Sequence, residues 1–156
     1  MADKNIINID PAGSCDLDHL FYEIQMLNET ANYQAKDRLE NNAFLESFLV
    51  HARILINFLR GTDNWLDDIK ISDFKDNNGL QLNSVLVDLD SDLIVKINKH
   101  LQHLSKKRAE EKFGWFKMVI KEKINDKLKE FLNNIGDNYF IDAKYKKEDF
   151  FKLLNK

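Results

Sequence analysis

Two residues that can transfer protons and bind anions lie close together in the stretch ESFLVHARILINFL. His51 titrates near neutral pH, and Arg53 can hold a phosphate or carboxylate through two parallel hydrogen bonds. On a helix, residues two apart point ~200° away from each other, so this pair needs a second helix to enclose one small ligand. The favoured interpretation is structural: His51 makes a hydrogen bond on the helix flank, and Arg53 pairs with Glu46 or another acid.

A second group of nitrogen-bearing side chains occurs in INKHLQHLSKKR. His100 and His103 have the i, i+3 spacing that can hold a metal ion, but neither a cysteine nor an acid lies on that face. We therefore predict no metal site and no cofactor. Arg108 falls on the apolar track of the same helix, where a guanidinium group requires an anionic partner.

The acids that follow the first group are the expected partners of Arg108. They occur in the segment DNWLDDIKISDF, as Asp67, Asp68 and Asp73. If this segment and the second group close over the first, His51, Arg53, His103 and Arg108 form one polar cluster. A buried ion network is favoured over catalysis as the role of that cluster.

The element that must position these side chains is the helix predicted from Asn41 to Arg60. Its broad apolar face is centred on Phe48, Ala52 and Leu55, and a narrow polar stripe containing Arg53 lies opposite. We expect this helix to be central in the fold. Asn41 or Asn42 is the predicted N-cap, and Gly61 is predicted to end the helix.

Other helices are predicted from apolar residues at three- and four-residue spacing. They cover residues 16–31, 91–104, about 110–135 and 148–154, with a short helix or turn at 66–69. Residues 80–89 alternate in polarity, but a single strand has no partner, so an extended linker or a helical turn is favoured. The fold class is therefore all-α: a single-domain helical bundle of about four main helices plus short additional helices.

Length and composition agree with one domain. The 156 residues include only five glycines and one proline, which favours long helices. We predict a flexible N-terminal leader at residues 1–14 and one bundle domain at 15–156. One cysteine fits a reducing cytoplasm, and no apolar run reaches the ~18 residues of a membrane-spanning helix.

Charge is distributed unevenly along the chain. Residues 1–95 carry 7 Lys/Arg against 17 Asp/Glu, a charge of −10, and residues 96–156 carry 16 against 9, a charge of +7. Mutual neutralisation within the fold is favoured over a basic surface for RNA, because the lysines alternate with acids at helical spacing. RNA is thus the less favoured partner, and the sequence carries no DNA-binding signature and no membrane anchor.

Apolar side chains outside the inward faces indicate a partner surface. Tyr22 and Met26 form a second stripe on the first helix, and Trp115, Met118 and Val119 point away from the inward face of the long helix near residue 120. We expect Tyr22, Met26 and Trp115 to support a homo-oligomer.

Residues 44–115 resemble a family of uncharacterised bacterial proteins. The resemblance rests on HARILINF, on LDDIKISDF and on NKHLQHLSKKR ahead of Trp115. This chain has Asn57 where the family pattern has aspartate, and Ser105 where it has threonine. The family has no established activity, so the resemblance implies a bacterial helical protein and no particular mechanism.

The bundle also resembles, more distantly, the HEPN domains, which include RNA-cleaving toxins and phage-defence proteins. Their motif places an arginine ahead of a histidine on one helix, whereas here His103 precedes Arg108. The resemblance implies a metal-independent endoribonuclease in which His103 acts as acid and base and Arg53 or Arg108 stabilises the phosphate. The leading hypothesis remains a self-associating helical interaction protein of the bacterial cytoplasm.

Overall fold

The computed structural model describes residues 16–62, 67–89, 91–102 and 116–156, and within these ranges the fold is all-α. The elements follow in the order α1 (Asp16–Asn32), α2 (Arg38–Arg60), the 3-10 helix η1 (Ile71–Asp73), α3 (Ser91–Gln102), α5 (Lys117–Asn134), the 3-10 helix η2 (Asp137–Phe140) and α6 (Lys147–Leu154). The predicted fold class is confirmed. The described residues contain four helices of 12 to 23 residues and, in addition, the eight-residue C-terminal helix α6.

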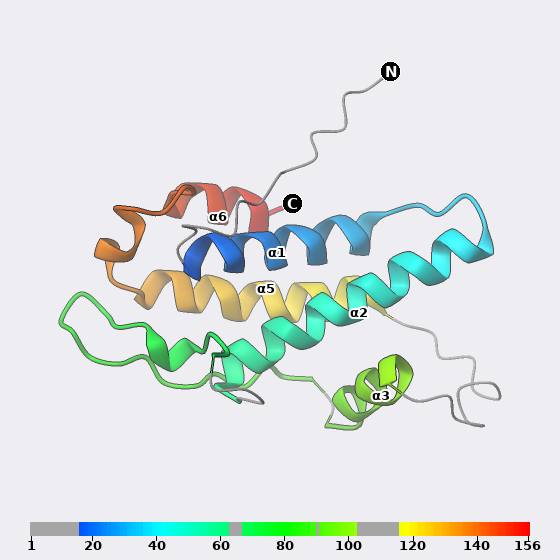
Figure 1. The fold of residues 1–156 in the computed structure, drawn as a ribbon, viewed down its shortest axis with the longest axis horizontal. Coiled ribbons are helices and arrows are strands. Elements are labelled where there is room, and N and C mark those ends of the chain that lie inside the picture. Colours follow the sequence, from blue (N-terminus) through cyan, green and yellow to red (C-terminus); the bar gives the residue numbers. More distant parts are fainter. Residues whose placement is uncertain (1–15, 63–66, 90, 103–115) are drawn as a thin grey trace, which may run out of the picture.

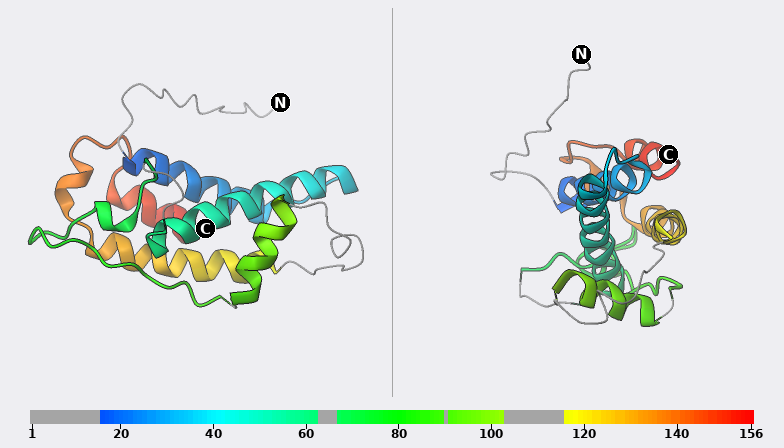
Figure 2. Two further views of the ribbon diagram at one scale, coloured as in Figure 1. Left: turned by 60° about the horizontal axis from the view of Figure 1, so that its bottom comes forward. Right: turned by 90° about the vertical axis from the view of Figure 1, so that its right-hand side faces the viewer.

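Helix α2 is central in the described part of the chain, as the apolar wheel predicts. It contacts α1, α3, α5 and η1, and its apolar face is buried, from Phe48 and Leu49 to Leu59. α1 and α2 form a hairpin whose helices diverge away from their connecting turn, and α5 lies behind both (Figure 1). α6 packs on α1 and α5, whereas α3 lies on the opposite side of α2 (Figure 2).

The boundaries of α2 show which local signals end a helix. Asp37 is the N-cap, and its carboxylate accepts a hydrogen bond from the backbone N–H of Glu40 at 2.8 Å. The predicted caps Asn41 and Asn42 are wrong, because the helix begins four residues ahead of Asn42 through an exposed, polar turn. Gly61 ends the helix with φ of 65°, a left-handed conformation that glycine adopts without a Cβ clash.

The other boundaries differ from the prediction in three places. The short helix expected at 66–69 lies at Ile71–Asp73, and residue 66 is outside the described ranges. α5 begins at Lys117 with Phe116 as its N-cap, so the predicted start near residue 110 also lies outside them. The segment after α5, for which no helix is predicted, forms η2. Residues 80–89 form no strand; one isolated bridge joins Lys75 and Gln81.

The core is continuous between the helices and is rich in aromatic rings. Phe58, Phe74 and Phe131 meet edge to face at centroid distances of 5.2 to 6.0 Å and join α2, the segment after η1 and α5. Among the described helices, none combines the length and the apolar character needed to cross a membrane.

An aromatic and polar clasp closes the α1–α2 hairpin near its turn. Tyr33 stacks on Phe44 with ring centroids 3.5 Å apart, and its hydroxyl donates to Glu40 at 2.7 Å. The backbone N–H of Lys36 donates to the other oxygen of Glu40 at 2.6 Å. The hydrogen bond from Tyr33, and then that from Lys36, hold the pKa of the Glu40 carboxyl below its usual value.

We predict that Tyr33→Phe moves the pKa of Glu40 up towards its ordinary value, because the largest stabilising contact of the carboxylate is removed. A group whose pKa is lowered in the folded state contributes stability above its unfolded pKa, and that contribution is lost as the pH falls through the folded value. The clasp should therefore loosen at acid pH. An NMR titration of the Glu40 side chain measures the shift, with Tyr22→Phe as the control, and an unchanged titration in Tyr33→Phe contradicts the prediction.

Candidate functional site

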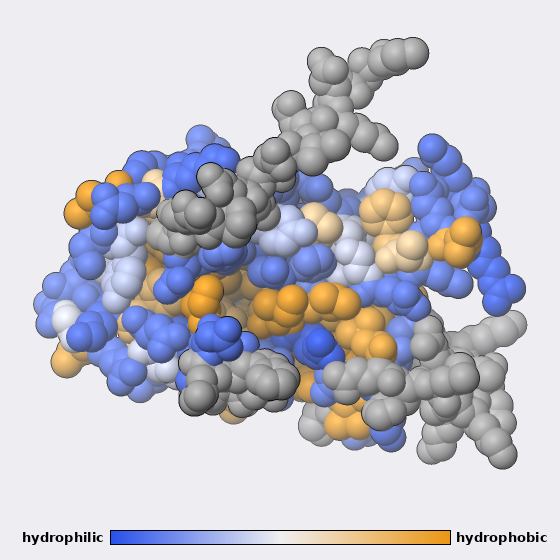
Figure 3. Space-filling model, in the orientation of Figure 1, coloured by the Kyte–Doolittle hydropathy of each residue, from blue (hydrophilic) through white to orange (hydrophobic). Residues whose placement is uncertain are grey.

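An open groove lies where α1 and α2 diverge. It has a volume of about 320 Å³ and also receives the segment after α2; its lining residues are Asp16, His19, Leu20, Glu23, Ile54, Leu55, Phe58, Asp67, Asp68 and Ile69. We call it the α1–α2 groove. Figure 3 shows hydrophobic side chains between the two helices, bordered by hydrophilic ones. In this groove apolar surface and charged side chains meet in a concave shape.

The floor and the rim of the α1–α2 groove differ in chemistry. Leu20, Leu55 and Phe58 form a floor of core side chains, and Ile54, 39% exposed, lies at the edge. The rim contains four carboxylates, those of Asp16, Glu23, Asp67 and Asp68, and none of the lining residues is lysine or arginine. The chemistry of such a site is complementary to a ligand that is both apolar and cationic.

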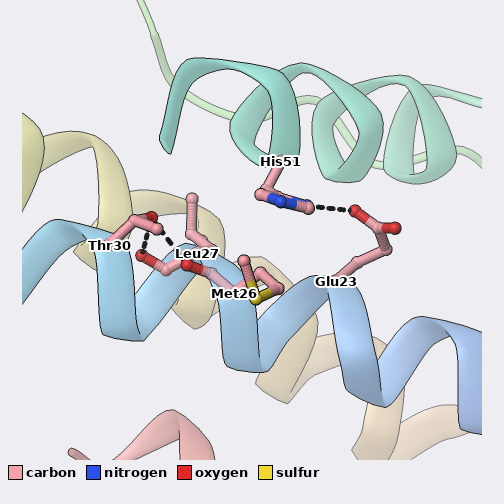
Figure 4. A network of polar contacts seen from close by, with 5 residues as sticks. All are labelled: Glu23, Met26, Leu27, Thr30 and His51. Carbon is pink, nitrogen blue, oxygen red and sulfur yellow. Dashed lines mark hydrogen bonds and ion pairs between the residues drawn. The ribbon is translucent and has the colours of Figure 1, made fainter. Parts of the chain in front are cut away.

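His51 lies inside the helix pair at one end of this groove. It is 9% exposed, and its Nδ1–H donates to Glu23 Oε2 at 2.6 Å, since a carboxylate oxygen accepts the bond (Figure 4). The ring of Tyr22 meets the imidazole edge to face at 5.9 Å. His51 is not among the groove-lining residues, so Glu23 connects the buried histidine to the groove.

A hydrogen bond on the flank of the helix was predicted for His51, and Glu23 is the acceptor of that bond. Arg53 is partly exposed on α2 and does not line the groove, so the two residues of HAR lie apart as their helical spacing requires. Their predicted convergence with His103 and Arg108 lies outside the described residues. Trp115 also lies outside them.

The predicted acids separate into two positions. Asp67 and Asp68 line the α1–α2 groove. Asp73 instead accepts a hydrogen bond from the backbone N–H of Lys70 at 2.8 Å and caps η1. Their predicted pairing with Arg108 cannot be followed within the described ranges, but only the first two belong to the concave site.

Tyr22 and Met26 lie at the α1–α2 contact, each partly buried. Tyr22 packs on His51 across the helix pair, and Met26 follows one turn later on α1 (Figure 4). The second apolar stripe of α1 therefore serves the hairpin. Exposed apolar side chains occur instead at the start of α5, where Phe116, Met118 and Val119 are 75%, 43% and 48% exposed. We call these three residues the α5 patch.

Of the groove-lining residues, only Asp67 and Asp68 were expected as site residues from the sequence, and the polar residues Asp16, His19 and Glu23 were not. Glu23 carried a readable signal, because it falls between the two apolar stripes of α1 on a helical wheel and must lie at the edge of the buried face. Within the described part of the chain, no three His, Cys, Asp or Glu side chains are grouped so as to hold a metal ion.

No protein-family model matches the chain, and neither a curated protein nor a solved structure is similar enough to match it. The resemblances to the uncharacterised bacterial family and to HEPN domains therefore remain predictions.

We predict that Glu23→Leu destabilises the fold by about 1–3 kcal/mol, because the Nδ1–H of His51 is left without an acceptor in a buried position. Urea unfolding measures the loss. Glu23→Gln, which keeps an acceptor oxygen of the same reach, should cost clearly less, and the double variant Glu23→Leu with His51→Leu less than the sum of the two single changes. Equal stability of wild type and Glu23→Leu contradicts the role given to the pair.

Proposed function

We propose that the protein is a helical interaction protein of the bacterial cytoplasm that self-associates. The observation that carries this proposal is the α5 patch, in which three large apolar side chains are exposed within four residues. Exposed apolar side chains grouped in this way are typical of protein–protein contacts. The resemblance to a bacterial family and the single cysteine support the location.

The surface beside the α5 patch suits a second copy of the chain. Glu122 and Asp126 are exposed on the solvent side of α5. Lys123 and Lys127 lie between and beside them, and within the chain they pair with Asp88 and Glu130. An isologous contact places the same surface on both subunits, so a surface bearing both signs can pair acid with lysine across a two-fold axis. This arrangement supports a dimer built on α5.

Light scattering over a wide range of protein concentration tests the proposal. The mass is expected to rise above the 18.4 kDa of one chain as the concentration increases, and Met118→Ser with Val119→Ser should keep it at one chain. Glu29→Gln is the matched surface control, since Glu29 is exposed on α1. A wild type that stays at the monomer mass throughout contradicts self-association.

A metal-independent ribonuclease is the second candidate, and the His51–Glu23 pair is the observation that favours it. A histidine fixed by a carboxylate is a frequent arrangement in general acid–base catalysis, and His103 and Arg108 would supply the remaining groups. A broad RNA panel incubated with wild type, His103→Ala and Arg108→Ala decides between the candidates. Cleavage by wild type that both variants lose establishes the enzyme, and intact RNA with wild type excludes it.

A further inference from the structure

The α1–α2 groove is a second contact surface, separate from the α5 patch. The groove involves the first two turns of α1, whereas Lys117, which lies between Phe116 and Met118 in the sequence, donates to the carbonyl of Thr30 near the end of α1. At 1.5 Å per residue, these two places are roughly 15 Å apart along α1. One partner helix bound in the groove therefore leaves the α5 patch open.

The size and shape of the groove limit its ligand. Its volume of about 320 Å³ is at the lower end of the range for ligand pockets, about 300–1,000 Å³. The groove is bounded by α1 on one side and α2 on the other, so it is elongated and open to solvent (Figure 3). A few side chains from one face of a helix fit such a site, as in helix-in-groove recognition.

Charge decides which helix fits. The rim carries the carboxylates of Asp16, Asp67 and Asp68 besides Glu23, which binds His51. The first 95 residues, which supply every lining residue, carry a net charge of −10. An acidic helix would be repelled by this surface, whereas lysine and arginine side chains would be attracted to it.

We infer that the α1–α2 groove binds a cationic amphipathic helix of a partner protein. Leucine-like side chains on one face of that helix contact Leu20, Ile54 and Phe58, and its lysine or arginine residues pair with Asp16 and Asp67. Apolar contacts with the groove floor supply most of the binding affinity. The carboxylates of the rim select a cationic helix, because ion pairs at a rim speed association more than they strengthen binding.

A fluorescence anisotropy titration tests the inference with two designed peptide probes. One is a labelled amphipathic helix of leucine and lysine, and the other has glutamate in place of every lysine. Both are titrated with the Met118→Ser, Val119→Ser protein, so that self-association through the α5 patch does not contribute. The leucine–lysine helix is expected to bind, and the leucine–glutamate helix is not. Binding of both, or of neither, overturns the inference.

Matched variants separate the groove from general charge attraction. Asp16→Asn with Asp67→Asn should weaken binding of the leucine–lysine helix about tenfold, because two rim pairs are lost. Glu122→Gln with Asp126→Asn removes the same charge from the exposed side of α5 and should leave binding unchanged. Equal weakening by both pairs means non-specific attraction to an acidic protein and overturns the groove as the site.

A third variant tests the apolar floor. Ile54→Ser changes a side chain that is already 39% exposed, so the fold should survive, as an unchanged urea midpoint would show. Binding of the leucine–lysine helix should fall at least as far as in the rim variant. Unaltered binding in a folded Ile54→Ser protein shows that the helix contacts the rim alone and contradicts insertion into the groove. The outcome of these titrations does not depend on whether the wild type self-associates.

Discussion

Replacing Phe131 by alanine is expected to lower the free energy of unfolding by about 3–5 kcal/mol, the range for truncating a buried aromatic side chain. Phe131 on α5 is 1% exposed and meets Phe58 at 5.2 Å and Phe74 at 5.4 Å, edge to face in both cases. Its removal leaves a cavity among rings from three separate parts of the chain. Those parts are far apart in the sequence. Closing the cavity would therefore require α2, the segment after η1 and α5 to move together, which a small backbone shift does not achieve.

The same substitution should also damage the α1–α2 groove. Phe58 belongs both to the ring cluster and to the groove floor, so loss of Phe131 loosens the side chain that the proposed partner helix contacts. Urea unfolding gives the stability, and anisotropy with the leucine–lysine helix gives the binding. Leu39→Ala is the control, because Leu39 is 79% exposed and lies outside both the groove and the α5 patch, so its truncation should change stability by less than about 0.5 kcal/mol. Similar losses in the two variants would contradict the assigned core.

The sequence predicts the helices whose buried residues recur at helical spacing. It does not predict helical turns that are exposed and have no buried face. α1 is buried at Leu17, Leu20, Ile24 and Leu27, a spacing that specifies the helix and its inner face. The first turns of α2 are exposed and carry no such pattern. They begin at the N-cap Asp37, whose carboxylate accepts a hydrogen bond from the backbone N–H of Glu40. The Glu40 carboxylate itself accepts hydrogen bonds from Tyr33 and Lys36, just ahead of the helix. In a polar stretch, such a cap is a weaker signal of a helix than the apolar spacing of a buried helix.

The candidate site was only partly predictable for a different reason. Asp67 and Asp68 were expected to face the His51 helix, and they do lie at its groove, but the groove depends on the divergence of α1 from α2. Both helices pack against α5, which is far away in sequence, and the way helices pack on one another determines their crossing angles. Local residue patterns hold no measure of an interhelical angle, so they do not show that Ile54 lies at the edge of an open groove.

A buried pair of asparagine side chains joins α1, α5 and α6 near the C-terminal end of α1, away from the α1–α2 groove. Asn125 on α5 donates to Asn28 Oδ1 at 2.9 Å, and Asn28 donates to the backbone carbonyl of Leu153 in α6 at 3.2 Å. Both side chains are nearly inaccessible to solvent. A buried polar group that loses its partner costs about 1–3 kcal/mol, so these two residues fasten the short α6 to the bundle.

We expect Asn28→Ala to cost about 2–3 kcal/mol and Asn125→Ala to cost less. Asn28→Ala leaves both the Asn125 amide and the Leu153 carbonyl without their shorter bonds. Asn125→Ala also deletes Asn125 Oδ1, a buried oxygen that has no hydrogen-bond partner in the described structure, and this gain offsets part of the loss. Urea unfolding measures both changes, and hydrogen exchange in α6 shows whether that helix is released first. The exposed Asn133 on α5 is the control, since alanine there removes no buried contact and has the higher helix propensity. If Asn125→Ala is the more destabilising change, Asn125 Oδ1 must have a hydrogen-bond partner. The buried network would then include more than these two residues.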